Sequence, residues 1–279
     1  MILDKFPVEY EPENGARIGL LPRGPDGLID TSQEVKWFDC KVGVVLHTIN
    51  AHESEDGQSL VLHAFRATPS TEGSYMQKNA PSCLYEWAID LVNGTLSEQC
   101  LNPYTLVEFP TINDLRRRKE LTYSYGLLHY GFGGPLTEVV SAPHDGFVFN
   151  GVVKFTMKDD PGRGLRKGDV FDHFSLPRNW YAVSEACLVP KKETSATQGG
   201  GGISDQDSNE NAYITLLATY IPPDGRSFLE IASDETIMKS HFLIIDADNM
   251  AAGPVSAVEL PVSVRYGLHS LFLEWDKHV

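Results

Sequence analysis

The sequence predicts an all-β protein, and three observations support this. Runs of strand length, rich in Val, Leu, Ile, Tyr and Phe, alternate with turn residues along most of the 279 residues. Asp56-Gly57, Asn93-Gly94 and Asp224-Gly225 are hairpin signals, because glycine and asparagine tolerate the positive φ angles of tight turns. No amphipathic helix of more than about three turns is evident. The pattern fits a sandwich, a barrel or a propeller, and does not choose among them.

Each predicted strand is an apolar run bounded by turn residues. Between two of them, residues 191–211 have almost no apolar side chains and include four consecutive glycines. Such a composition cannot bury a core, so we expect a disordered surface loop there. The predicted strands cover residues 41–49, 59–66, 84–92, 95–100, 121–130, 146–157, 169–176, 213–221, 227–232, 242–246 and 256–260.

Composition excludes several classes of function. The formal net charge of −15 repels phosphate backbones, so we expect no nucleic-acid partner. The four cysteines form no C-x-x-C pair, which argues against a cysteine zinc site and suits a reducing compartment. No apolar run approaches the roughly 18 residues of a membrane span, and the first residues lack the features of a secretory signal. We therefore expect a cytoplasmic location.

Two of the nine histidines stand out from the rest. His47 ends an apolar run and His269 lies among apolar residues near the C-terminus. Each is either a hydrogen-bonded core histidine or a metal ligand, since imidazole binds Fe, Cu and Zn. The sequence contains no H-E-x-x-H, P-loop, G-x-S-x-G or G-x-G-x-x-G motif, so nucleophilic and nucleotide-binding chemistry have no support.

Two glutamates sit in similarly apolar surroundings, Glu108 in "LVEFPTIN" and Glu185 in "AVSEACLVP". A metal-bound histidine normally donates its other ring N–H to a carboxylate or a carbonyl. A buried carboxylate needs such a partner, because burial of an isolated charge is costly. The alternative is that each glutamate faces solvent at the edge of a strand.

Five motifs, in order along the chain, resemble the C-terminal part of the carotenoid cleavage oxygenases. This family also includes stilbene-cleaving dioxygenases and the retinoid isomerase of the visual cycle. The motifs span nearly the whole chain, and in combination they are specific. They are "ARIGLLPR" (16–23), "HTINAHE" (47–53), "VEFPTIN" (107–113) with "YSYGL" (123–127), "SEACLVP" (184–190) and the stretch 241–270 that ends in "GLHS".

The resemblance implies part of a seven-bladed β-propeller, with residues 1–279 forming one N-terminally incomplete domain. Family members hold Fe(II) on the propeller axis with four histidines, oriented by outer glutamates. Carried over by motif, His47 and His269 are iron ligands, Glu108 orients His47 and Glu185 orients His269. The implied reaction is cleavage of a conjugated C=C bond of a carotenoid, apocarotenoid or stilbene by O₂ into two carbonyl products. Peripheral membrane contact is also implied.

The sequence departs from the family pattern in several places. Leu268 and Ser270 replace phenylalanine and glycine beside His269, Arg265 replaces a proline, and His52 replaces an aromatic residue. More seriously, the family's first two iron-binding histidines precede the region matched here. We therefore expect a truncated form that lacks two of four ligands and whose partner is a missing N-terminal half.

Two other functions stay open. One is a non-catalytic propeller remnant that acts as a binding or interaction module. The other is an unrelated iron enzyme with two histidines and one carboxylate, in which Glu108 or Glu185 is a direct ligand. For the hairpin that follows His47, we expect Asn50 and Glu53 to form a polar turn.

Overall fold

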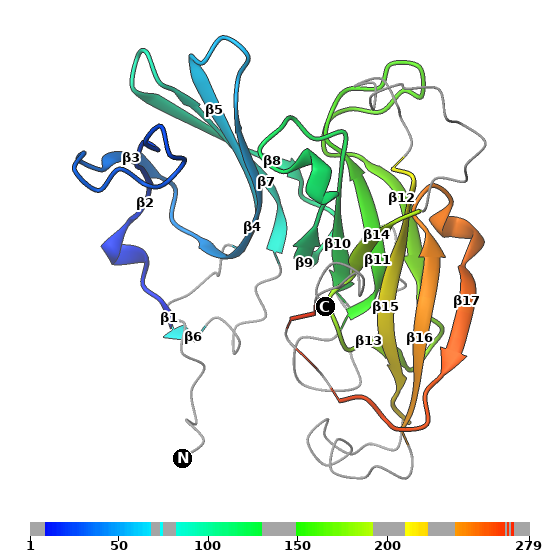
Figure 1. Cartoon of the computed structure of the whole chain (residues 1–279). Coiled ribbons are helices and arrows are strands. Elements are labelled where there is room, and N and C mark those ends of the chain that lie inside the picture. Colours follow the sequence, from blue (N-terminus) through cyan, green and yellow to red (C-terminus); the bar gives the residue numbers. More distant parts are fainter. Residues whose placement is uncertain are drawn as a thin grey trace.

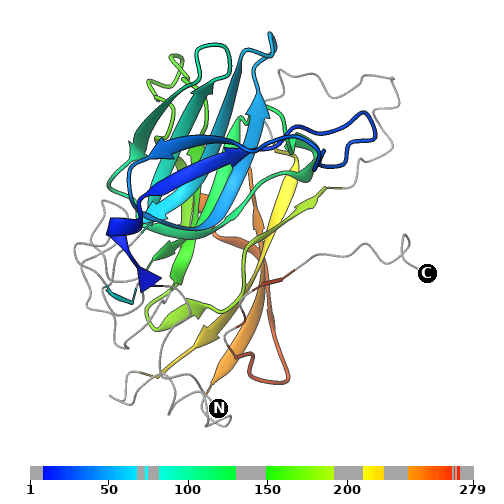
Figure 2. The same ribbon diagram turned by 90° about the vertical axis from the view of Figure 1, so that its left-hand side faces the viewer.

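The computed structural model describes residues 9–67, 73–74, 82–129, 149–191, 210–222, 238–265, 267, 269 and 270. Its strands form antiparallel sheets, and its helices are single 3₁₀ turns. A four-stranded sheet and a nine-stranded sheet lie side by side, with β9 nearest to the smaller sheet (Figures 1 and 2). The predicted all-β class with antiparallel strands is confirmed.

The smaller sheet is a four-stranded meander in which each strand pairs with the next along the chain. Its tight hairpins lie where the sequence predicted them, because Gly57 and Gly94 adopt φ angles of 66° and 68°. The predicted hairpin turns at Asp56-Gly57 and Asn93-Gly94 are therefore confirmed. The strands are β4 (Val44–Glu53), β5 (Ser59–Ala67), β7 (Ser82–Asp90) and β8 (Thr95–Asn102).

The larger sheet consists of two further four-stranded meanders, β9 to β12 and β14 to β17. They are joined by the short strand β13, where Ala182 pairs with Phe149 of β11 and with Ala218 of β15. The strands are β9 (Val107–Thr111), β10 (Tyr123–His129), β11 (Phe149–Thr156), β12 (Val170–Ser175), β13 (Trp180–Ala182), β14 (Cys187–Pro190), β15 (Ala212–Tyr220), β16 (Lys239–Asp246) and β17 (Pro254–Glu259).

Two small strand pairs and three single helical turns complete the described fold. The pair β2–β3 is close to β8 in the four-stranded sheet. The pairs are β1 (Glu9–Tyr10) with β6 (Gly73–Ser74) and β2 (Ala16–Leu20) with β3 (Lys36–Cys40), and the helical turns are η1 (Pro12–Asn14), η3 (Asp114–Arg116) and η5 (Met250–Ala252).

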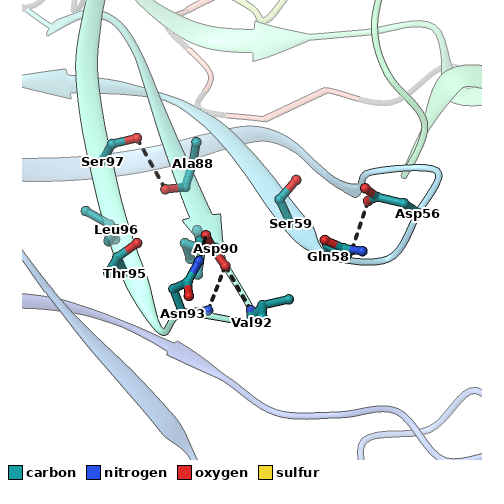
Figure 3. A pocket seen from close by; sticks show the side chains of 11 residues that line it. Asp56, Gln58, Ser59, Ala88, Asp90, Val92, Asn93, Thr95, Leu96 and Ser97 are labelled. Atoms are coloured by element: carbon teal, nitrogen blue, oxygen red, sulfur yellow. Dashed lines mark hydrogen bonds between the residues drawn. The ribbon is translucent and has the colours of Figure 1, made fainter.

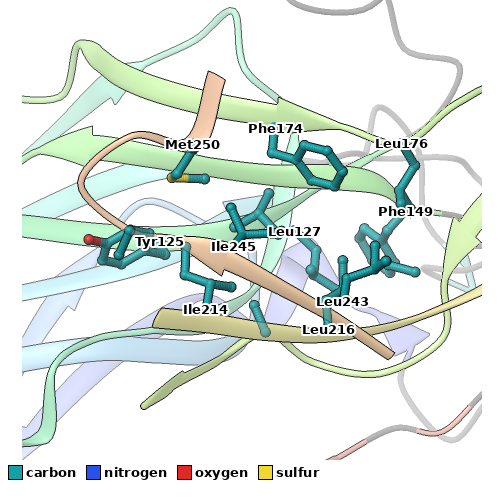
Figure 4. Close-up of a cluster of buried hydrophobic side chains, with 14 of the residues drawn as sticks. Tyr125, Leu127, Phe149, Phe174, Leu176, Ile214, Leu216, Leu243, Ile245 and Met250 are labelled. Atoms are coloured by element: carbon teal, nitrogen blue, oxygen red, sulfur yellow. The ribbon is translucent and has the colours of Figure 1, made fainter. Parts of the chain in front are cut away.

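Apolar side chains of the larger sheet form the main core (Figure 4). Tyr125, Phe149 and Ile214 in this cluster have no accessible surface. A second cluster connects the two sheets, with Phe65 and Leu84 from the small sheet packed with strands β9 to β11. Full burial of one such side chain contributes about 1.5–3 kcal/mol to folding. These clusters hold β4, β9 and β10 in fixed relative positions, and those strands carry half of the site described below.

Most predicted strands are present within two to four residues of their expected ends, but seven described strands lie outside the predicted ranges. They have two to five residues each, and they are β1, β2, β3, β6, β9, β13 and β14, of which β9 and β14 contain proline. Such segments give little period-2 signal. Of the predicted loop at 191–211, residues 192–209 lie outside the described residues, as do the predicted strand at 227–232 and the predicted turn at 224–225.

The predicted polar turn at Asn50 and Glu53 is wrong, because both residues belong to β4 and the turn begins after Glu53. Asn50 is buried and holds a loop that follows β9. Its Nδ2 donates to the carbonyl of Lys119 at 2.8 Å, and its Oδ1 accepts from the N–H of Arg118 at 2.9 Å. A polar residue here satisfies backbone groups of another segment, which local sequence could not reveal.

Candidate metal centre

His47 and His269 come together in the structure although they lie at opposite ends of the chain. Their ring centroids are 5.5 Å apart and the rings are nearly perpendicular, at 78°. Phe109 packs against both, with its ring 5.0 Å from that of His47 and 6.0 Å from that of His269. The three rings form one cluster, with His47 on β4 and Phe109 on β9. Its polar atoms are the ring nitrogens of the two histidines.

Glu108 fixes the orientation of the His47 ring. Its Oε2 accepts a hydrogen bond from Nδ1 of His47 at 2.7 Å. Glu108 is only 2% exposed, so its predicted alternative, a glutamate facing solvent, is wrong. The same carboxylate also accepts from the N–H of Phe109 at 2.9 Å and from the hydroxyl of Ser82 at 3.1 Å. Three hydrogen bonds satisfy the buried charge.

The local backbone explains how the Glu108 carboxylate accepts hydrogen bonds both from its own strand and from His47. Phe109 adopts a φ angle of 51°, in the left-handed region that phenylalanine rarely occupies. The register of β9 against β10 shifts at the same point, between Tyr125 and Leu127. Such irregularities re-aim a side chain, and backbone strain of this kind concentrates at functional sites. At this irregular point, the N–H of Phe109 donates to the Glu108 carboxylate, and the ring of Phe109 packs against the ring of His47.

Glu185 holds His269 in a similar way. Its Oε1 accepts from Nδ1 of His269 at 2.8 Å, and its Oε2 accepts from the N–H of Ser270 at 3.1 Å. The segment is anchored by the N–H of Gly267, which donates to the carbonyl of Val183 at 2.7 Å. The His269 side chain is 65% exposed, whereas that of Glu185 is 20% exposed. The solvent-facing alternative for Glu185 is therefore also wrong, because its carboxylate faces the histidine.

The two carboxylates set the electrostatics of the cluster. The hydrogen bond to Glu108 raises the pKa of His47, burial opposes this, and the charges of Glu108 and Glu185 add to the increase. The His47 side chain is 27% exposed, so these effects act at the boundary between core and solvent. Each imidazole therefore has a carboxylate at its Nδ1, and this negative charge favours the binding of a cation next to the two rings.

The donor atoms fit one half of a four-histidine metal site. Because Nδ1 of each ring donates to a carboxylate, the lone pair of each neutral imidazole is on Nε2. Two imidazoles whose centroids are 5.5 Å apart are close enough to share one ion. Within the described ranges, no cluster of three or more His, Cys, Asp or Glu side chains is arranged to hold a metal ion. In both histidines of the cluster, the glutamate contacts Nδ1 and not Nε2.

Comparison with known proteins identifies the family. The family model described as "RPE65: Retinal pigment epithelial membrane protein" matches residues 4–274. The chain belongs to this family. It is 28% identical over 290 residues to a carotenoid 9,10(9',10')-cleavage dioxygenase of Crocus sativus and 26% identical over 272 residues to the corresponding dioxygenase 1 of Phaseolus vulgaris. The alignments cover 98% and 95% of this chain but 44% and 42% of those relatives.

Solved structures of the apocarotenoid oxygenase of Synechocystis are among those that match. One variant superposes with a TM-score of 0.62 at 20% identity, and the cobalt-substituted enzyme with a TM-score of 0.61 at 19% identity. Both matches cover 93% of this chain and 44% of the Synechocystis chain. At this identity the match shows the fold alone. The three meanders are thus blades of the C-terminal portion of a family β-propeller.

Two surface cavities lie outside the histidine cluster. One, of about 440 Å³, lies between the hairpins at the far end of the small sheet, lined by Asp56 and Asp90 among others (Figure 3). Both carboxylates accept hydrogen bonds from nearby turn residues, so they are structural. A second cavity, of about 320 Å³, touches the back of Glu185 and Ser270. This cavity accounts for the partial exposure of Glu185.

Sequence reasoning missed the groups that support the two carboxylates. The residues around Ser82 gave no indication of its contact with Glu108, because that contact depends on the pairing of β7 with the rest of its sheet. Ser270 was noted only as a departure from the family, yet its hydroxyl also donates to the carbonyl of Glu185 at 3.3 Å. The four cysteines are all described and free, as expected. In the described part, no helix is long and apolar enough to cross a bilayer.

Proposed function

We propose that this chain is the C-terminal, iron-binding part of an Fe(II)-dependent dioxygenase that cleaves a conjugated C=C bond of a polyene or stilbene with O₂ into two carbonyl products. The observation that carries the proposal is the pair of facing imidazoles, each with Nδ1 hydrogen-bonded to its own glutamate. A paired carboxylate fixes the tautomer and raises the basicity of a metal-bound histidine. Two such pairs meeting at one point are hard to explain as independent core contacts.

In this proposal His47 and His269 bind Fe(II) through Nε2. Glu108 and Glu185 keep the proton of each ring at Nδ1. When bound, the iron activates O₂, while the protein supplies orientation and a dry environment. Phe109, whose ring packs 5.3 Å from the buried ring of Phe149, gives the site an apolar surface next to His47. Such a surface suits a hydrocarbon chain and excludes water from that side of the site.

The complete site needs a second part of the protein. The resemblance implies four histidine ligands, and this chain spans less than half the length of its relatives. We infer that an N-terminal segment supplies the remaining two. The relatives' names support a carotenoid-type substrate. We further propose a cytoplasmic protein that contacts membranes peripherally to reach a lipid-soluble substrate.

A second function, a binding module without catalysis, is favoured by one observation. Only two imidazoles meet at the centre within the described residues, and His269 is 65% exposed. A propeller part of this kind could hold an apolar ligand or a protein partner without retaining iron. The two proposals differ in whether the completed protein binds Fe(II) and consumes O₂.

The test joins this chain to the N-terminal segment of the Crocus sativus relative that precedes the matched region. The hybrid is loaded with Fe(II) and supplied with β-carotene or an apocarotenal in detergent. We expect O₂-dependent formation of two carbonyl products, lost in the His47→Ala and His269→Ala hybrids. An iron-loaded, folded hybrid that binds the polyene but forms no product would support the binding module instead.

A further inference from the structure

A second pair of histidines, His52 and His63, lies away from the candidate metal centre. Both come from the β4–β5 hairpin, and the register pairs His63 with Asn50 on one side and with Glu86 on the other. His52 is two residues beyond Asn50, so it lies on the same face of the sheet. The two rings have centroids 6.2 Å apart and are nearly parallel, at 21°. His63 is 1% exposed.

The ring nitrogens of this pair are unequally satisfied. Nε2 of His63 donates to Oε2 of Glu86 at 2.8 Å. Nδ1 of His63 and Nδ1 of His52 are both buried and lack a hydrogen-bond partner within the described part of the chain. An unpaired buried nitrogen costs roughly 1–3 kcal/mol. Two such atoms on neighbouring side chains point to a shared ligand.

The charge state of the pair also favours a cation ligand. With its Nε2 proton directed at Glu86, a neutral His63 exposes a lone pair on Nδ1. Burial lowers the pKa of His52, and the neighbouring His63 adds to this, so the environment favours the neutral form of this ring over the protonated form. A carboxylate behind one imidazole repeats the arrangement of Glu108 and His47, in which the far nitrogen is left for a metal.

We propose that His52 and His63 bind a second metal ion, a divalent transition-metal cation such as Zn²⁺, through their Nδ1 atoms. Imidazole is a preferred ligand for this class of ion. Water completes the coordination. The proposal does not depend on the dioxygenase function, because these residues are outside the candidate metal centre.

The ion would lie between two blades of the propeller. Glu86 on β7 forms an ion pair with Lys167, which belongs to the turn between β11 and β12 of the neighbouring sheet. Glu120, which precedes β10, is close enough for its charge to raise the pKa of His52. A cation here would therefore be held where the two sheets meet, and it would stabilise their contact. The positive charge of Lys167 opposes the ion, which gives a second way to test the site.

The test is a Zn²⁺ titration of the full chain by calorimetry. His52→Phe is the main variant, because related proteins carry an aromatic residue there and the fold should tolerate it. A His47→Asn/His269→Asn background removes the first site. In this background we expect one equivalent of Zn²⁺ to bind, and His52→Phe to abolish it. Lys167→Gln should tighten binding.

A matched control is His241→Ala, which removes a histidine that stacks on Trp180 at 4.6 Å, away from both sites. It should leave Zn²⁺ binding unchanged. A second measurement uses the chain with all histidines intact: Zn²⁺ should raise its melting temperature, and His52→Phe should reduce that increase. The proposal is overturned if the background variant, folded by circular dichroism, binds no Zn²⁺, or if His52→Phe leaves the stoichiometry and affinity unchanged.

Discussion

Nδ1 of His47 lies 2.7 Å from Oε2 of Glu108, although 61 residues separate them in the sequence. The equivalent contact between His269 and Glu185 spans 84 residues. Each pair therefore depends on the assembled sheets, and in each pair the carboxylate contacts Nδ1 of the imidazole and leaves Nε2 for a ligand. This relationship is the structural basis of the proposed iron site.

Glu108→Gln tests whether the carboxylate acts through His47. An amide cannot supply the negative charge that favours a bound metal, although it retains the size of the side chain. We expect iron affinity to fall by about 10–100-fold, measured by competition with a chromogenic chelator. Glu98→Gln is the control, because Glu98 is a buried glutamate of the small sheet that accepts from Trp87 at 3.0 Å. Equal affinities for the two variants would contradict the role of Glu108.

Gly151→Ala tests the packing of β11 against β12. A Cβ atom at this position would overlap the carbonyl oxygen of Phe174 on the neighbouring strand. The backbone of the neighbouring strand cannot move aside as a flexible side chain can, so we expect the free energy of unfolding to fall by about 1–3 kcal/mol. Urea denaturation measures it.

Gly162→Ala is the matched control for that prediction. A Cβ there would meet only the carboxylate end of Asp160, at 3.3 Å, which can move. We expect a change within about 0.5 kcal/mol. If both alanine variants were equally stable, the assigned close approach of Gly151 and Phe174 would be wrong.

Asp246→Asn tests an ion pair at the end of β16. Asp246 accepts from Nζ of Lys191 at 2.7 Å. Burial would raise the pKa of Asp246, but the hydrogen bonds from Lys191 and from the N–H of Asp248 lower it below 3.8. A lowered carboxyl pKa stabilises the fold above the unfolded value and loses that contribution as the pH falls through the folded value.

We therefore expect Asp246→Asn to reduce the free energy of unfolding by up to about 1 kcal/mol at pH 7, because both groups are partly exposed. The difference from the unchanged chain should disappear in acid, once the pH has fallen through the lowered pKa of Asp246. Denaturation curves at both pH values measure this. A deficit that persists in acid would show that the aspartate acts through packing rather than charge.

Much of the fold could be predicted because its strands are long and alternate in polarity. β5, β7 and β15 each have nine residues and are bounded by clear turn signals. β9 was missed as a strand, because its five residues include Pro110 and the left-handed Phe109. Proline and an irregular backbone are the features that propensity rules treat as evidence against a strand.

The candidate site was predictable only through motifs. His47 and Glu108 were singled out by their apolar surroundings and by family resemblance, whereas the contact between them required the pairing of β9 with β10 and its packing on β4. Neither a motif nor the family resemblance indicated that His52 and His63 lie together. His63 looked like an ordinary strand histidine, and only the strand register shows that it faces Glu86.

The most direct test of the central claim counts the imidazoles on iron. The hybrid with the N-terminal segment, carrying His52→Phe to remove the second proposed site, is loaded with Fe(II) without oxygen and treated with nitric oxide. Pulsed electron paramagnetic resonance then resolves the nitrogen couplings of bound imidazoles. We predict four imidazoles, with one lost in His47→Ala and another lost in His269→Ala. Couplings unchanged in both variants would contradict the assignment of these histidines as iron ligands.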